Sequence, residues 1–160
     1  MELTLRRHNP TDPALADVLD LIRSSFAYMD GVIDPPSSIH RLTLDALRTQ
    51  ADLGEVWSIG PPLCACAVFT LQPDALYVGK LAVAPHSRGQ GLARRLLDHA
   101  VDRARCHGRD TVELQTRVEL TANHAVFTGL GFRETGRTSH PGFNRPTSIT
   151  FRRQVPLTAP

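Results

Sequence analysis

The sequence has little excess charge and no long apolar segment. Its 18 basic residues stand against 16 acidic ones, so the formal net charge is only +2, whereas a general nucleic-acid-binding surface is usually more basic. No segment approaches the roughly 18 uninterrupted apolar residues of a membrane-spanning helix. The first seven residues do not form a basic start with an apolar block behind it. We therefore expect no secretion signal, no membrane span and no nucleic-acid partner.

Cysteine is scarce as well. The chain has three cysteines, an odd number that cannot pair completely. Cys64 and Cys66 lie two residues apart in an apolar run, and Cys106 falls near a predicted helix end. This usage predicts a reducing, cytoplasmic location. A chain of 160 residues, 41% of them hydrophobic, can bury about 70% of its unfolded surface. Residues 1–160 are therefore expected to form one domain that needs neither a disulfide nor a metal.

Lysine is nearly absent, since Lys80 is the single lysine among the 18 basic residues. The planar guanidinium of arginine can bind a phosphate through two parallel hydrogen bonds. The arginines are scattered rather than clustered, however, which favours a compositional origin such as a GC-rich genome. Only Arg88 is singled out, because a glycine-rich turn lies beside it.

The spacing of apolar residues predicts a mixed α/β sheet. Asp12 and Thr43 are the expected N-caps of the first two helices, with Pro13 as the first helical position. Gly79 is expected to mark a bulge in the central strand. The expected strands are 3–5, 56–59, 63–71, 75–84, 112–118 and 149–155, and the expected helices are 13–29, 44–50, 92–104 and 122–130.

A glycine-rich turn joins the central strand to the helix that follows, with the sequence Arg-Gly-Gln-Gly-Leu-Ala over residues 88–93. The first amides of a helix lack partners within it, and the helix dipole favours an anion there. Gly89 and Gly91 carry no side chain that would block a phosphate. The turn predicts a pyrophosphate site, although a Gly-x-Gly turn can equally serve to reverse the chain. The sequence contains neither the Gly-x-Gly-x-x-Gly nor the Gly-Lys-Ser/Thr nucleotide motif.

Two motifs in register carry a family resemblance. Arg88, Gly91 and Ala93 meet the signature Gln/Arg-x-x-Gly-x-Gly/Ala directly after the apolar strand. Residues 122–132 add a second segment, Ala-Asn-His-Ala-Val-Phe through Leu-Gly-Phe. The chain resembles the GNAT superfamily of acyl-CoA-dependent N-acetyltransferases, and the order of predicted elements matches over nearly its whole length. The resemblance implies a mixed, mostly antiparallel sheet with splayed central strands and helices on both faces.

The resemblance implies acetyl-CoA as the cofactor. The strands that contain Gly79 and Leu114 would splay apart and admit the thioester, although Gly79 is as readily explained by close packing. Asn123 would touch the cofactor arm, or would only cap its own helix. The pantetheine arm would pair with the backbone of Leu81, Ala82 and Val83, and the pyrophosphate with amides of Arg88, Gly89, Gln90, Gly91, Leu92 and Ala93.

Phe127 departs from the family pattern, because many relatives have a tyrosine there that protonates the leaving sulfur. A thiol with a pKa near 8.5 can leave as the thiolate, so we expect a reduced rate rather than loss of activity. The attacking amine must also lose a proton. Tyr77 and His124 are the candidate bases, with His140 as a further alternative, and each has an ordinary structural explanation as well.

The irregular loops beside the splayed strands are expected to bind the acceptor. Asp30 and Asp34 could bind a cationic amine, although Asp-Gly and Asp-Pro pairs are equally good turn formers. The candidate acceptor-binding residues are Tyr28, Asp30, Asp34 and His140. The acceptor would be a small-molecule or peptide amine whose identity stays open, as does assembly into a homodimer.

Two functions compete. The first is an N-acetyltransferase in which a primary amine attacks acetyl-CoA directly and forms a tetrahedral intermediate, its oxyanion held by a backbone N–H near Leu81. The alternative is a non-catalytic module that binds or senses acyl-CoA on the same fold, which the missing tyrosine keeps open. A cysteine nucleophile is disfavoured, because Cys64 and Cys66 lie in an apolar strand.

Overall fold

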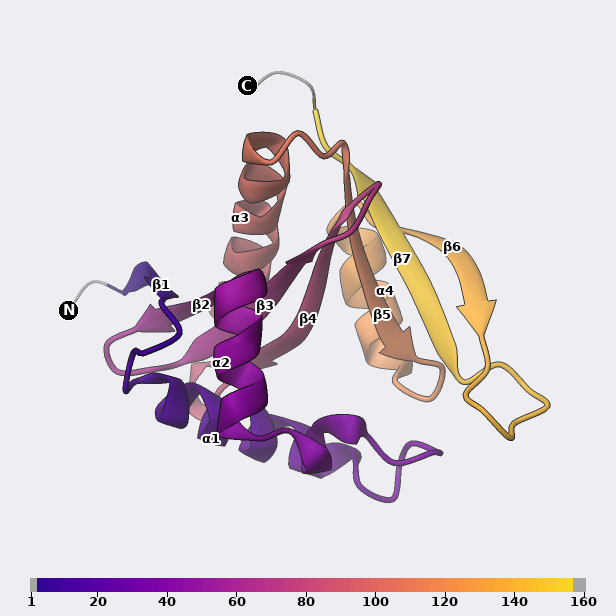
Figure 1. Cartoon of the computed structure of the whole chain (residues 1–160). Helices are drawn as coiled ribbons and strands as arrows, with labels where there is room; N and C mark the ends of the chain where they lie inside the picture. The colour runs from indigo at the N-terminus through magenta and orange to yellow at the C-terminus, as the bar shows by residue number, and fades with distance from the viewer. Residues whose placement is uncertain (1–2, 157–160) are drawn as a thin grey trace.

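The computed structural model describes residues 3–156, apart from the side chain of Tyr28, and contains a seven-stranded sheet with helices on both faces (Figure 1). The strand order is β1-β2-β3-β4-β5-β7-β6. Neighbouring strands are antiparallel except β4 and β5, which are parallel. This confirms the mixed, mostly antiparallel sheet. The strands are β1 Thr4–His8, β2 Glu55–Gly60, β3 Ala65–Leu71, β4 Leu76–Val83, β5 Thr111–Arg117, β6 Arg133–Thr138 and β7 Ser148–Gln154; the α-helices are α1 Leu15–Phe26, α2 Leu44–Leu53, α3 Leu92–Cys106 and α4 Thr121–Gly129; short 3₁₀ helices cover Ala27–Met29, Ser38–Arg41 and Pro85–Ser87.

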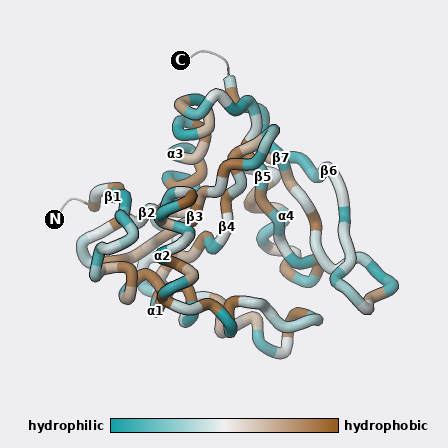
Figure 2. The backbone as a smooth tube through the Cα atoms, in the orientation of Figure 1, coloured by the Kyte–Doolittle hydropathy of each residue, from teal (hydrophilic) through white to brown (hydrophobic). Residues whose placement is uncertain are grey.

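The core divides into two clusters, one on each face of the sheet. Helices α1 and α2 pack against one face, where Cys66 and Val68 of β3 point. Helix α3 packs against the other face with Ala67 and Phe69 of β3, and α4 adds the half-buried Phe127. Alternate residues of β3 thus serve opposite layers, as a strand buried on both faces requires. Figure 2 shows hydrophobic residues along α1 and the central strands, whereas β6 is pale or hydrophilic.

Of the two predicted N-caps, only Thr43 caps its helix: the N-cap of α1 is Ala14, which has no side-chain cap hydrogen bond, and Asp12 bonds to the turn that precedes this helix. Oδ1 of Asp12 accepts a hydrogen bond from the backbone N–H of Ala14 (2.9 Å), and Oγ1 of Thr43 accepts one from Ala46 (3.1 Å). Helix α1 begins at Leu15, two residues later than predicted, because residues 13 and 14 still form a turn. The expected face of α1 is buried and packs on the sheet.

Strand β4 contains the predicted bulge. Cys66 and Val68 of β3 pair with Ala82 and Gly79 of β4, so β4 has one extra residue in this interval. Lys80 lies inside it with a φ of +52°, a value that is uncommon for a residue other than glycine. The bulge reverses the alternation of side chains along β4, because Val78 packs with the α3 layer and Ala82 with the α1 layer.

The sequence prediction missed one strand. Residues 133–138 form β6, which pairs with β7 and makes the hairpin that carries residues 139–147. All six residues of β6 are exposed. The segment therefore lacks the apolar alternation from which a strand is usually predicted, and its strand structure depends on pairing at the edge of the sheet.

His8 joins β1 to two other segments through buried hydrogen bonds. Its Nδ1 donates to Oδ2 of Asp12 (2.8 Å), and its Nε2 lies 2.6 Å from Oγ of Ser58. The three residues have the connectivity of a Ser-His-Asp triad. All three are buried, and none lines the pocket described below. These bonds therefore fasten β1 and the turn before α1 to β2, and they do not offer a substrate a reachable nucleophile.

Glu55, the first residue of β2, is a buried carboxylate with several hydrogen-bond partners. It is 4% exposed and accepts hydrogen bonds from Arg103 (2.9 and 2.6 Å), His107 (2.8 Å) and Trp57 (2.8 Å). Burial by itself raises the pKa of Glu55, but these hydrogen bonds outweigh it and lower the pKa from 4.5 to about 2. The carboxylate thus links β2 to the last turn of α3.

Replacing Glu55 by glutamine should lower the free energy of unfolding at pH 7 by about 2 to 3 kcal/mol, because Arg103 loses a buried partner. A depressed carboxyl pKa stabilises the fold above the unfolded value of 4.5, and this stabilisation is lost as the pH falls toward 2. The deficit of the variant in urea unfolding should therefore shrink between pH 4.5 and pH 2. A deficit that stays constant over this range would contradict the assignment.

Candidate active site

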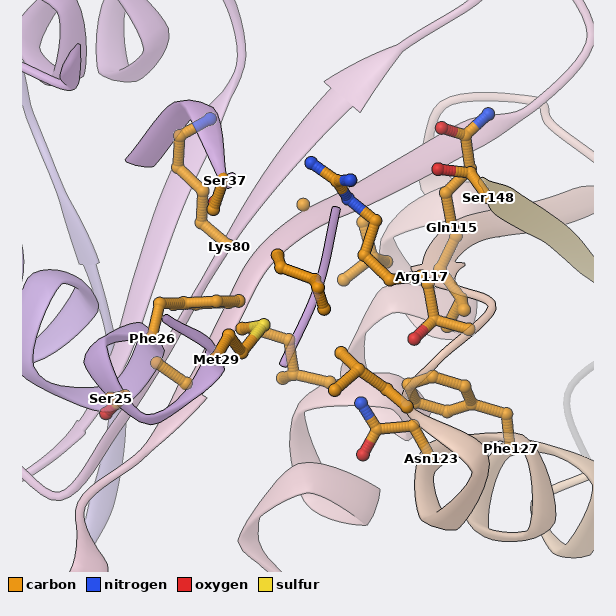
Figure 3. Close-up of a pocket in the computed structure, with 18 of the residues that line it drawn as sticks. Ser25, Phe26, Met29, Ser37, Lys80, Gln115, Arg117, Asn123, Phe127 and Ser148 are labelled. Carbon is orange, nitrogen blue, oxygen red and sulfur yellow. The ribbon is translucent and has the colours of Figure 1, made fainter. Parts of the chain in front are cut away.

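The sheet opens between its two parallel strands. β4 and β5 pair at only three positions, the last of which joins Val78 to Leu114. Beyond these residues the strands diverge, and a cavity of about 620 Å³ lies between them (Figure 3). The splayed central strands implied by the sequence resemblance are therefore present, and Gly79 and Leu114 both line the cavity.

The cavity is lined from both faces of the sheet. Leu114 and Thr116 of β5 point toward the α3 layer, whereas Gln115 and Arg117 alternate to the α1 side. Ala93 at the start of α3 and Phe127 of α4 line the first side. The second side is lined by Ser25, Phe26, Met29, Ile33, Ser37, Ser38, Tyr77 and His140. Two molecules could thus approach one point in the gap from opposite faces.

The glycine-rich turn leads into α3 as an open cradle. Gly89 and Gly91 have φ values of +79° and +74°, and an ideal Cβ built on either would meet no atom within 4 Å. Gly91 is the N-cap of α3, so the unpartnered amides of the first turn lie directly behind it. Arg88 and Ala93, at the two ends of the turn, line the pocket. This geometry suits an anion bound by backbone N–H groups.

The edge of β4 beyond the bulge borders the same cavity. On one side, Ala82 and Val83 pair with Cys66 and Ala65 of β3. On the other side, no pairing with β5 continues past Val78 among the described residues. Leu81, Ala82 and Val83 line the cavity, so an extended ligand could add to this edge as a strand does.

Helix α4 presents Asn123 and Phe127 to the cavity. Figure 3 shows the Asn123 side chain and the Phe127 ring directed into the pocket. The N-cap of α4 is Leu120, and no side chain caps this helix. The alternative that Asn123 serves as a local cap is therefore not supported. The Phe127 ring is half-buried, with its centroid 6.3 Å from that of Phe132 and 5.9 Å from that of Phe151.

The three candidate bases differ in position. Tyr77 lines the cavity, but burial and the nearby Glu113 raise its pKa, which makes its phenolate scarce at neutral pH. Nε2 of His124 bonds to the backbone oxygen of Arg117 (3.1 Å), and its ring packs near Phe151, so the structure directs it away from the cavity. His140 lines the cavity, and burial, followed by Arg117, lowers its pKa below the usual 6.5.

The carboxylates predicted to receive the amine lie elsewhere. Asp30 pairs with His40 (2.6 Å) and Asp34 with Arg145 (3.3 Å), both at exposed positions outside the lining of the cavity. These carboxylates order the loops, as the turn-forming alternative predicts. The side chain of Tyr28 lies outside the described residues.

Several polar residues that the sequence did not indicate as functional also line the cavity. They are Lys80, Gln115, Thr116, Arg117 and Ser148. The sequence does single out Lys80, because it is the only lysine and lies beside the predicted bulge. The rarity of a residue type does not by itself indicate a function. Within residues 3–156 no group of three or more histidine, cysteine or acidic side chains could hold a metal ion. No helix in that part of the chain is long and apolar enough to cross a membrane.

Comparison with known proteins gives a consistent result. The sequence model described as "Acetyltransferase (GNAT) family" matches residues 16–132. The IAA acetyltransferase of Azospirillum brasilense is 28% identical over 136 residues, which cover 84% of this chain and 86% of that protein. N-alpha-acetyltransferase 30 of Saccharomyces cerevisiae is 38% identical over 56 residues, which cover 35% of this chain and only 32% of that protein.

Solved structures agree at the level of the fold. The ribosomal-protein-S18-alanine N-acetyltransferase from Escherichia coli aligns with a TM-score of 0.75 over 99% of this chain and 97% of that one. The sequence identity is 21%, so the likeness establishes a shared architecture and says nothing about the acceptor.

Proposed function

The chain belongs to the GNAT acetyltransferase family, and on that premise we propose that it transfers an acetyl group from acetyl-CoA to a primary amine by direct attack. The observation that carries this proposal is the cavity between β4 and β5, lined from both faces of the sheet. A thioester entering from the α3 side and an amine entering from the α1 side would meet in the gap. The relatives are named for different acceptors, so the acceptor is argued below from this chain's own pocket.

Acetyl-CoA would bind along the α3 side. The backbone of Leu81, Ala82 and Val83 would hydrogen-bond to the pantetheine arm, and Asn123 would contact the same arm. The amides of residues 88–93 would hold the pyrophosphate, with the dipole of α3 adding a favourable field. The cofactor supplies the activated acetyl group, and the chain supplies its position and orientation.

The transfer then needs no covalent intermediate with the protein. The amine lone pair attacks the thioester carbonyl, a backbone N–H near Leu81 stabilises the oxyanion, and the C–S bond breaks to release CoA. Cys66 is fully buried, and desolvation raises its thiol pKa to about 12; burial also raises the pKa of Cys64. Neither thiol is therefore suited to act as a nucleophile. We also propose a reducing, cytoplasmic location, which the odd number of cysteines supports.

His140 is the base that the geometry supports best. Oγ1 of Thr147 accepts the backbone N–H of His140 (2.9 Å) and donates to the carbonyl of Thr138 (3.3 Å). The same oxygen bonds to Nδ1 of His140. We propose that the hydroxyl keeps its hydrogen on the bond to Thr138 and that Nδ1 carries the proton of the bond to Thr147, which leaves the lone pair on Nε2. The depressed pKa keeps the imidazole neutral at pH 7, so it can take a proton from the amine.

His140→Gln should lower kcat about tenfold at pH 7.5, a moderate loss because water can replace the base. In the parent protein, kcat at saturating substrates should fall as the pH drops through the depressed histidine pKa, below 6.5, because the base becomes protonated. The variant should lack this step. An unchanged pH profile in the variant would exclude His140 as the base.

The experiment that tests the proposed function is CoA release from acetyl-CoA in the presence of a panel of primary amines, with the acetylated product identified by mass spectrometry. Turnover with any amine excludes the alternative of a non-catalytic acyl-CoA sensor. Tight CoA binding without turnover across the panel would favour the sensor.

A further inference from the structure

The acceptor side of the pocket is cationic. Lys80 and Arg117 both line it, whereas no aspartate or glutamate is among the described residues that line the pocket. In Figure 3 the Lys80 ammonium and the Arg117 guanidinium lie toward Ser37, away from Asn123 and Phe127. We propose that the acceptor is a primary amine that also carries a carboxylate, and that Lys80 binds this carboxylate. The inference rests on the proposed acetyl transfer and names the acceptor class for it.

Lys80 is held in place by the bulge. Its left-handed backbone conformation is fixed by the register shift between β3 and β4, and its carbonyl accepts a hydrogen bond from the Cys66 thiol (3.8 Å). The side chain is half-buried, and no acidic side chain pairs with it in the described part of the chain. Burial lowers the pKa of its ammonium. An anion that enters the pocket would therefore stabilise the charged form of Lys80 through a charge-assisted hydrogen bond.

Arg117 strengthens the cationic field without taking the carboxylate itself. Its Nη1 and Nη2 donate to the carbonyls of Pro35 (2.7 Å) and Pro36 (3.2 Å), which holds the guanidinium across the gap. Burial lowers the pKa of Arg117, and the charges of Glu119 and Asp34 oppose this shift, but neither carboxylate lines the pocket. Oε2 of Glu119 accepts the backbone N–H of Asp34 (3.0 Å), and the Asp34 side chain pairs with Arg145. Arg117 thus keeps a positive charge at the pocket wall.

The other residues that line this side of the pocket restrict the chemical class of the acceptor further. Phe26, Met29 and Ile33 form an apolar wall on the same side. A polyamine or an aminoglycoside would bring several positive charges toward Lys80 and Arg117 and would be repelled. An amino acid with an apolar side chain fits all three features, because its carboxylate meets Lys80, its side chain meets the apolar wall, and its amine is left for the thioester. Repulsion from the two cations would also favour the neutral, reactive form of that amine.

The test compares L-leucine with L-leucinamide and 1,4-diaminobutane as acceptors for the full-length protein and for Lys80→Met. With the parent protein, kcat/KM should be at least about tenfold higher for leucine than for leucinamide, the range expected for one charge-assisted hydrogen bond. Lys80→Met should raise KM for leucine about tenfold and leave KM for acetyl-CoA unchanged. Lys80→Arg should restore part of the loss. Arg48→Met removes an exposed charge from α2 and is the matched control, with no expected effect.

Four outcomes would overturn the inference. Equal use of leucine, leucinamide and diaminobutane would leave acetyl transfer intact but exclude a carboxylate subsite. A raised KM for acetyl-CoA in Lys80→Met would assign Lys80 to the cofactor. A stoichiometric gain of one acetyl group on Lys80, detected by peptide mass spectrometry, would make the lysine an acceptor itself. The subsite would also be excluded if leucine were not turned over and did not bind to the CoA complex in calorimetry. If the protein bound CoA but turned over no amine at all, this result would count against the proposed function as well.

Discussion

Gly91→Val is expected to abolish CoA binding, with a Kd raised about 100-fold or more if two or more phosphate contacts are lost. Gly91 is the N-cap of α3 with a φ of +74°, and a Cβ there points into open space. We propose that this space receives the pyrophosphate. A valine would fill it and, being β-branched, would also disfavour the left-handed backbone that aims the amides of the turn. Isothermal titration with CoA measures the loss.

The matched control for this variant is Gly108→Val. Gly108 follows the other end of α3, with a φ of +71° and equally open space at its Cβ. Both substitutions impose a similar backbone strain of about 1 to 2 kcal/mol, but the 15-residue helix separates them by about 22 Å. Gly108→Val should therefore melt at a lower temperature and still bind CoA. Normal CoA binding by Gly91→Val would show that the turn does not hold the pyrophosphate.

The parts of the fold that could be predicted from the sequence are those with a local physical cause. Apolar periodicity placed the four α-helices and the buried strands, and capping chemistry identified Thr43 as the N-cap of α2. The glycine at position 79 marked the bulge next to it. Strand β6 could not be predicted in this way, because all of its residues are exposed and its pairing with β7 is a tertiary feature.

The same distinction between local and tertiary causes applies to the candidate site. The glycine-rich turn, the β4 edge and α4 lie in contiguous motifs, so their residues could be named from the sequence and now line or border one cavity. The acceptor side is assembled from residues far apart in the chain. Asp30 and Asp34 were expected there, but each pairs with a basic side chain outside the cavity, His40 and Arg145 respectively. Lys80 and Arg117 line that side instead. The bulge places Lys80 there, and Arg117 at the end of β5 is held by the carbonyls of the α1–α2 loop.

Phe127→Tyr is expected to raise the rate of acetyl transfer by about a hundredfold, the lower range of general-acid catalysis. The Phe127 ring lines the cavity from α4, and Figure 3 shows it extending from the helix into the pocket. We propose that the pantetheine sulfur lies in this part of the cavity. A tyrosine adds one oxygen at the end of the ring, from which a proton can be given to the leaving thiolate. Turnover at saturating acetyl-CoA, monitored by thiol release, measures the gain.

Phe132→Tyr adds the same oxygen to a neighbouring ring and separates catalysis from a general effect of the hydroxyl. The two ring centroids lie 6.3 Å apart, but Phe132 is 1% exposed and belongs to the core between α3 and the sheet. Its new hydroxyl would lack a partner, which costs about 1 to 3 kcal/mol and should lower the melting temperature without a gain in rate. Phe127→Tyr should keep its melting temperature, because the half-buried ring borders an open cavity. If Phe127→Tyr instead lost stability and gained no rate, position 127 would be part of the core, and the leaving sulfur would have to lie elsewhere.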